Sequence, residues 1–188
     1  MTAVLDVEPV VRRPELVEPL EGIDSTPQTR VEVLACGAPD RGDDGAAVIA
    51  VGRLADALPP DVRTRLVGQL DIDDLLAVPK GAGVVVADTA LGVDPGWIVE
   101  IPFSGLAGRE AGIRPRSSHA LSIPETVAVA SIIRGHPLPG IVVAIGGVDF
   151  GLGEALSWPV ASAMDAFVLA IADAVGRVRT LVLTTPRT

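Results

Sequence analysis

The sequence predicts an α/β fold, a three-layer α/β/α sandwich built around a mainly parallel sheet. Short apolar runs at 31–36, 84–87 and 141–145 lie between turn residues and are typical of buried strands. Segments with helical spacing of apolar residues, at 44–58 and 158–175, follow two of these runs. Strands and helices that alternate in this way favour a parallel sheet covered by helices on both faces.

Shorter patterns predict two more strands and two more helices, at 64–67, 97–101, 71–76 and 122–134. The segment 97–101 follows a turn and is expected to join the sheet as an antiparallel strand. Asp71 is the expected N-cap of the helix 71–76. Ser122 and Glu125 have the spacing of a capping box, which predicts the start of the helix 122–134.

The length and composition predict one compact domain. The chain has 188 residues, of which 48% are hydrophobic. We expect the domain to span 30–178, preceded by a flexible, acidic and proline-containing tail at 1–29 and followed by a C-terminal extension at 179–188. No apolar run approaches the roughly 20 residues of a membrane span, and the first residues do not resemble a secretory signal. A cytoplasmic protein without membrane contact is the expectation.

The charge and the aromatic content argue against nucleic acid as a partner. The net charge is −9, whereas nucleic-acid binding depends on Lys and Arg that neutralise phosphates. The chain has no Tyr, and its three Phe and two Trp offer few stacking platforms. The single cysteine, Cys36, excludes an internal disulfide and a cysteine-based zinc motif, and it is expected to be a small core residue.

Three polar residues form the candidate site. Asp44 follows the first strand, Asp88 follows the strand 84–87, and His119 lies in a later polar loop. Because the carboxyl ends of parallel strands meet at one edge, the two carboxylates are expected to lie together. Two carboxylates and an imidazole suit a divalent first-row metal ion and metal-assisted hydrolysis. The simpler interpretation is that each residue fills a turn or a helix cap, and a cap is the favoured role for Asp43.

Other chemistries fit the sequence less well. No Gly-x-Ser-x-Gly nucleophile motif occurs, and Cys36 has no evident base. The loop 37–42 lacks the Gly-x-Gly-x-x-Gly spacing of dinucleotide sites, and two carboxylates at a helix start would repel a pyrophosphate.

These segments together resemble the hydrogenase maturation endopeptidases. The resemblance covers most of 31–175 and is carried by six segments: the glycine loop 37–45 with Asp43 and Asp44, the strand that ends in Asp88, Pro95 and Gly96, Ser118 and His119 with Leu121, the turn 135–137, and the stretch 153–160.

The resemblance implies an endopeptidase that removes a C-terminal peptide from the nickel-loaded large-subunit precursor of a nickel-iron hydrogenase. By position, Asp44, Asp88 and His119 would be the catalytic and metal-recognising residues, and the nickel would belong to the precursor rather than to the enzyme.

The chain differs from this family at two positions of the loop. Ala38 stands where the family usually has Asn, and Asp44 stands where it often has Glu. Two alternatives therefore remain open: a non-catalytic chaperone or binding module for a hydrogenase precursor, and a generic metal-dependent peptidase or amidase.

Overall fold

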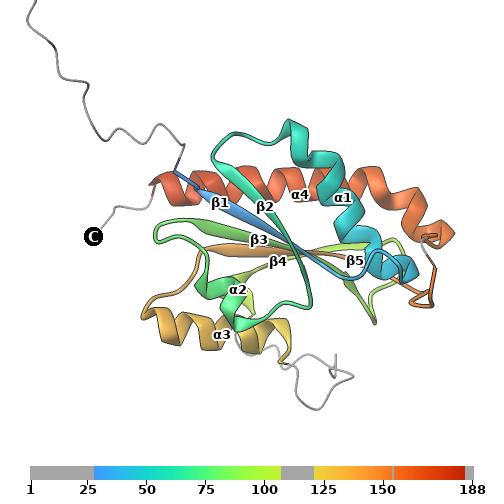
Figure 1. Ribbon diagram of the computed structural model, residues 1–188, viewed down its shortest axis with the longest axis horizontal. Helices are drawn as coiled ribbons and strands as arrows, with labels where there is room; N and C mark the ends of the chain where they lie inside the picture. Colours follow the sequence, from blue (N-terminus) through green and yellow to red (C-terminus); the bar gives the residue numbers. More distant parts are fainter. Residues whose placement is uncertain (1–27, 107–120, 154, 185–188) are drawn as a thin grey trace, which may run out of the picture.

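The computed structural model describes residues 28–106, 121–153 and 155–184, and it contains one five-stranded sheet between two layers of helices (Figure 1). The strands are β1 (Val31–Cys36), β2 (Val62–Gly68), β3 (Gly83–Ala90), β4 (Ile98–Pro102) and β5 (Gly140–Gly146). The α-helices are α1 (Ala46–Leu54), α2 (Ile72–Leu76), α3 (Ile123–Arg134) and α4 (Trp158–Thr184). Short 3-10 helices occur at η1 (Gly42–Gly45), η2 (Ala55–Ala57) and η3 (Phe103–Gly105).

The strand order in the sheet is β2-β1-β3-β5-β4. The first four strands in this order run parallel, and β4 pairs with β5 in the antiparallel direction. The mainly parallel sheet and its one antiparallel strand are therefore confirmed. Because β1 and β3 are neighbours near the centre, the loops that follow them emerge side by side at one edge of the sheet.

Helices α1 and α4 cover one face of the sheet, and α2 and α3 cover the other (Figure 1). Alternate residues of the central strands supply the two cores. Val33 and Val85 pack with α1 and α4, whereas Leu34 and Val86 pack on the side of α2 and α3. The apolar stripe predicted on the last helix is buried at Val160, Met164, Phe167, Ile171 and Val175.

Two of the predicted helix starts are confirmed in detail. The Asp71 side chain accepts a hydrogen bond from the Ile72 amide, and a capping box with Asp74 opens α2. The Ser122 amide donates to Glu125 Oε2 at 2.8 Å at the start of α3. These helix starts could be predicted from the sequence because the two residues of each capping hydrogen bond lie within four positions of each other.

The single helix predicted at 44–58 is wrong in its bounds. The segment is divided into η1, α1 and η2, and the residue after η2, Leu58, is extended with ψ 146°. Pro59 explains the end, because a proline disfavours helical backbone in the residue before it. At the other end, Asp43 and Asp44 lie in the 3-10 helix η1 and not in α1, and both side chains make the hydrogen bonds described below.

The last helix passes the predicted domain limit at 178. Helix α4 continues to Thr184, and Val182 packs against the core, where it lies close to Gly83. Residues 179–184 are therefore part of the last helix. The tail 1–27 and the final residues 185–188 lie outside the described residues. None of the helices described combines the length and the apolar character required to cross a membrane.

Candidate active site at the carboxyl edge of the sheet

Asp44 lies in the loop that leaves β1, and the loop wraps closely around it. The chain turns at Gly37, where φ is +107°. A Cβ at this position would lie 1.9 Å from the Asp44 carbonyl oxygen, so only glycine fits. The next amide, that of Ala38, donates to Asp44 Oδ2 at 2.9 Å. The side chain of Asp44 is therefore held by the backbone of its own loop.

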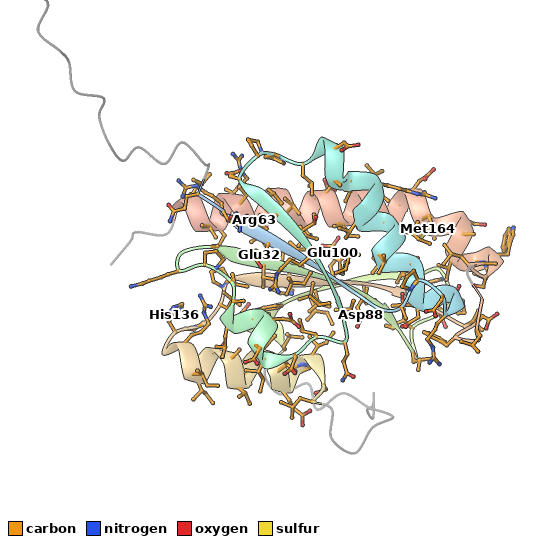
Figure 2. All side chains as sticks on the ribbon, viewed as in Figure 1. Glu32, Arg63, Asp88, Glu100, His136 and Met164 are labelled. Carbon is orange, nitrogen blue, oxygen red and sulfur yellow. The ribbon has the colours of Figure 1, made fainter. Side chains whose placement is uncertain are left out.

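Asp88 lies near the end of β3, one strand away. The structure extends β3 to Ala90, so the strand does not stop at Asp88 as the sequence suggested. By alternation with Val84 and Val86, its side chain projects from the sheet on the side of α2 and α3 (Figure 2). Asp88 Oδ1 accepts a hydrogen bond from the Thr89 amide at 2.8 Å.

The two carboxylates interact electrostatically, as the sequence predicted from their places on neighbouring strands. Burial raises the pKa of Asp88 to about 7, the hydrogen bond from the Thr89 amide opposes the increase, and the negative charge of Asp44 adds to it. A carboxyl pair of this kind binds a cation favourably, because the cation removes the repulsion between the two charges.

Cys36 lies beside this acid pair but offers no nucleophile. Its side chain is buried, and both burial and the charges of Asp88, Asp74 and Asp44 raise the pKa of the thiol far above its ordinary value. A thiol that stays protonated is a poor nucleophile and a poor metal ligand. The prediction that Cys36 is a core residue is confirmed.

Asp43 is fully buried and has a structural role, but it is not the helix cap that the sequence suggested. Its carboxylate accepts hydrogen bonds from the amides of Val148, Asp149 and Ser157 at 2.7–2.9 Å and from the Ser157 hydroxyl at 2.8 Å. Burial alone would raise the pKa of Asp43, but these four bonds outweigh burial and lower it. The carboxylate thus ties the loop after β1 to the segment that joins β5 to α4.

Ser157 and Thr89 complete this arrangement. The Ser157 carbonyl accepts a hydrogen bond from the Ala161 amide in the first turn of α4, and the Ser157 hydroxyl donates to Asp43. The buried Thr89 hydroxyl donates to the Asp43 carbonyl oxygen at 2.8 Å. Thr89 was not among the predicted site residues, although a polar residue directly after Asp88 in an apolar strand is a signal in the sequence.

The predicted third member of the site, His119, lies outside the described residues. In the part of the chain that the structure describes, no group of three or more His, Cys, Asp and Glu side chains is arranged to hold a metal ion. His136 follows α3, lies away from Asp88 (Figure 2) and contacts the Pro137 carbonyl oxygen at 3.1 Å, so it is not a member of the site.

Comparisons with known proteins identify the fold. No family model and no curated protein matches the sequence. Among solved structures, the chain is similar to the [NiFe] hydrogenase maturation protease HybD from Thermococcus kodakarensis, with 24% identity and a TM-score of 0.61 over 78% of this chain and 99% of that one. It is also similar to the hydrogenase maturating endopeptidase HybD from E. coli, with 16% identity and a TM-score of 0.64 over 79% and 93%.

A third similar structure is a hydrogenase 2 maturation peptidase from a Thaumarchaeota archaeon, with 24% identity and a TM-score of 0.57 over 79% of this chain and 99% of that one. The chain therefore has the fold of these proteins across nearly their whole length. At such identities the likeness establishes the fold alone, which confirms the predicted α/β architecture.

Proposed function

We propose that this chain is a hydrogenase maturation endopeptidase, which removes a C-terminal peptide from the nickel-loaded large-subunit precursor of a nickel-iron hydrogenase. One observation carries the proposal: Asp44 and Asp88 follow neighbouring strands at the carboxyl edge of the sheet, where the charge of Asp44 adds to the raised pKa of Asp88, in the fold of solved hydrogenase maturation proteases. A cytoplasmic location is part of this proposal and rests on the sequence, whose first residues do not resemble a secretory signal.

In this function, the acid pair recognises the nickel ion that the precursor carries. Carboxylate oxygens together with an imidazole are suitable ligands for a divalent first-row ion, and His119 is the proposed third ligand. Asp44 is held ready by the Ala38 amide, and Asp88 by the Thr89 amide. The ion, once bound, would polarise the scissile carbonyl for attack by water.

The loop geometry explains how the chain tolerates Ala38, where the hydrogenase maturation endopeptidases usually have Asn. Asp44 is anchored through the backbone amide of Ala38, a contact that every residue except proline can make at that position. The replacement of Asn by Ala therefore leaves Asp44 with a hydrogen-bond partner. For this reason the endopeptidase is favoured over a non-catalytic module with the same fold.

The test is a cleavage assay on purified large-subunit precursor, run with nickel-loaded and nickel-free forms, with product masses read by mass spectrometry. We expect shortening of the loaded form alone by the parent protein. Asp44→Ala and Asp88→Ala should lose cleavage, whereas Asp165→Ala, which removes an exposed carboxylate on α4, should retain it.

Two other results would each reject the proposal. Precursor binding without cleavage by the parent protein would identify a binding module. Cleavage of nickel-free substrates, together with tight metal binding by the isolated chain, would identify a generic metal-dependent peptidase.

A further inference from the structure

Five large apolar side chains are exposed on two loops and at the start of α4, at the sheet edge that carries the acid pair. They are Leu91 and Trp97 in the β3–β4 turn, Val148 and Leu152 in the segment from β5 to α4, and Trp158 at the first residue of α4, with exposed fractions from 43% to 89%. We call these five residues the edge patch. Both tryptophans of the chain belong to it, and they are 68% and 81% exposed. Exposed tryptophans concentrated in this way are typical of an interaction surface.

The two loops that form the edge patch are in direct contact. The Gly96 amide donates to the Gly146 carbonyl oxygen at 2.8 Å, and the Gly146 amide donates to the Trp97 carbonyl oxygen at 2.8 Å. A Cβ at Gly96 would lie 2.6 Å from the Pro159 carbonyl oxygen, so the turn that carries Trp97 lies against the first turn of α4 beside Trp158.

The edge patch is also tied to the acid pair. The Val148 amide donates to the carboxylate of Asp43, the residue before Asp44. Gly153, next to Leu152, exchanges backbone hydrogen bonds with the same loop: its amide donates to Asp40 and its carbonyl accepts from Gly42, at 2.8 and 2.6 Å. The patch is therefore held in a fixed position relative to Asp44 before any partner arrives, which lowers the entropy lost on binding.

Charge indicates the kind of partner. The exposed charges on the described parts of the two patch loops are Asp94 and Asp149, and the adjoining loop after β1 adds Asp40 and one cation, Arg41. A second copy of this chain would bring the same acidic border against itself, which disfavours self-association. A different protein, with an apolar face bordered by Lys and Arg, is complementary.

We propose that the edge patch is the docking surface for the folded body of the protein substrate, while the substrate's C-terminal segment reaches Asp44 and Asp88. The inference rests on the proposed function, because that function brings a protein to this edge of the sheet. Beyond that function, we assign substrate affinity to the edge patch and expect the substrate to bind there through an apolar face bordered by Lys and Arg. Trp97 and Trp158 are the expected main contributors to affinity.

Intrinsic fluorescence tests the proposal directly, because the chain has no Tyr and both Trp lie in the patch. The probe is the nickel-loaded large-subunit precursor, in a tryptophan-free form or with its own emission subtracted. Binding should shift the emission of the patch to shorter wavelength and reduce quenching by acrylamide. Trp97→Phe and Trp158→Phe assign the signal to the remaining tryptophan.

Steady-state kinetics supply the second readout. Trp97→Ala and Trp158→Ala should each raise KM for the precursor about tenfold or more and leave kcat within about twofold, because the proposed role of both residues is to bind the body of the substrate and not its scissile bond. The matched control is Ile132→Ala on α3, which removes an apolar side chain that is 79% exposed near the other end of the strands. The control should leave both constants unchanged.

The outcomes separate this inference from the proposed function. Normal cleavage with unchanged KM in both alanine variants would overturn the docking surface and leave the endopeptidase intact. A fluorescence shift with no cleavage would support the docking surface and reject the endopeptidase. A concentration-dependent shift without precursor would reject the docking surface in favour of self-association, and the absence of any binding would reject both.

Discussion

Ser157 binds both oxygens of the Asp43 carboxylate, although the two residues are 114 positions apart in the chain. The Ser157 amide donates to Oδ1 at 2.7 Å and its hydroxyl donates to Oδ2 at 2.8 Å. These two hydrogen bonds connect the loop that carries Asp43 and Asp44 to the start of α4. Asp43 therefore organises the edge of the sheet, and Asp44 is placed there as its neighbour.

Removal of the Asp43 carboxylate is expected to lower stability strongly. Asp43→Ala would leave three amides and one hydroxyl without their acceptor, and unsatisfied buried donors carry a large desolvation penalty. We expect a loss of about 3 to 5 kcal/mol in the free energy of unfolding, measured by urea denaturation. Ser157→Ala, which removes the hydroxyl alone, should lose about 1 kcal/mol. Equal losses in the two variants would contradict this role.

The same carboxylate predicts a loss of stability in acid. The pKa of Asp43 in the folded protein lies below its value of 3.8 in a free chain. The unfolded state therefore takes up a proton first as the pH falls, so the contribution is fully present above about pH 4 and is lost below it. Thermal unfolding between pH 5 and 2.5 should show a smaller decline in Asp43→Asn than in the parent protein. Parallel curves would show that Asp43 does not titrate differently in the two states.

Gly37 should tolerate no side chain. Gly37→Ala combines a strained φ of +107° with a Cβ that would lie 1.9 Å from the Asp44 carbonyl oxygen, so the loop must move. We expect a loss of at least ~3 kcal/mol in stability, since backbone strain and a clash add together, and a loss of precursor cleavage. Gly81→Ala is the matched control, because φ there is +80° and no atom lies within 4 Å of the added Cβ. It should lose only about 1 kcal/mol.

The sequence predicted the fold well because the signals of this fold are local. Apolar runs, a capping box at Ser122 and the helical stripe that includes Phe167 each act within a few residues, and the structure confirms them. The placement of Asp44 and Asp88 at one edge of the sheet was also predictable, because the neighbouring parallel strands β1 and β3 bring their carboxyl ends to the same edge.

The role of Asp43 could not be predicted, because its partners are remote. A carboxylate before a helix has the pattern of an N-cap, and no local feature shows that its acceptor oxygens are used by Val148, Asp149 and Ser157. The edge patch could not be predicted for a different reason. In a sequence with 48% hydrophobic residues, no local pattern distinguishes an exposed Trp from a buried one. The role of His119 stays a prediction.

Asp88→Asn is expected to stabilise the metal-free protein at alkaline pH. The pKa of Asp88 rises from 3.8 to about 7 on folding, so the folded state holds a proton that the unfolded chain has released between these values. Stability therefore falls as the pH rises from about 4 to about 7, and it stays lower above that. Three pKa units correspond to about 4 kcal/mol, and the partial exposure of Asp88 reduces the expected effect to about 2 kcal/mol.

Thermal unfolding in the presence of EDTA, at pH 4 and pH 8, measures this effect. Asp88→Asn should match the parent protein at pH 4 and exceed it at pH 8, while it loses precursor cleavage at both. Asp165→Asn on the exposed surface of α4 should follow the parent protein at both pH values. An equal gain at pH 4 and pH 8 would show that the effect does not come from ionisation of Asp88.

Arg65 is expected to be essential for stability because it neutralises a buried carboxylate. Glu32, the second residue of β1 (labelled in Figure 2), is buried, with 4% of its surface exposed. The Arg65 guanidinium donates to its Oε2 at 2.9 Å. The same guanidinium reaches Asp74 Oδ1 at 3.1 Å, so it joins β1, β2 and α2. Arg65→Met would leave Glu32 without its cation, and a loss of about 3 kcal/mol is expected, as for other broken buried pairs.

A double-mutant cycle separates the pair from its surroundings. Glu32→Met combined with Arg65→Met replaces the ion pair by apolar side chains, and replacements of this kind are often neutral or stabilising. The double variant should therefore recover most of the stability that Arg65→Met alone loses, as measured by urea denaturation. Arg53→Met, which breaks the exposed pair with Asp165, is the control and should change stability by less than about 1 kcal/mol. If the losses of the two single variants simply add in the double variant, Glu32 and Arg65 are not energetically coupled.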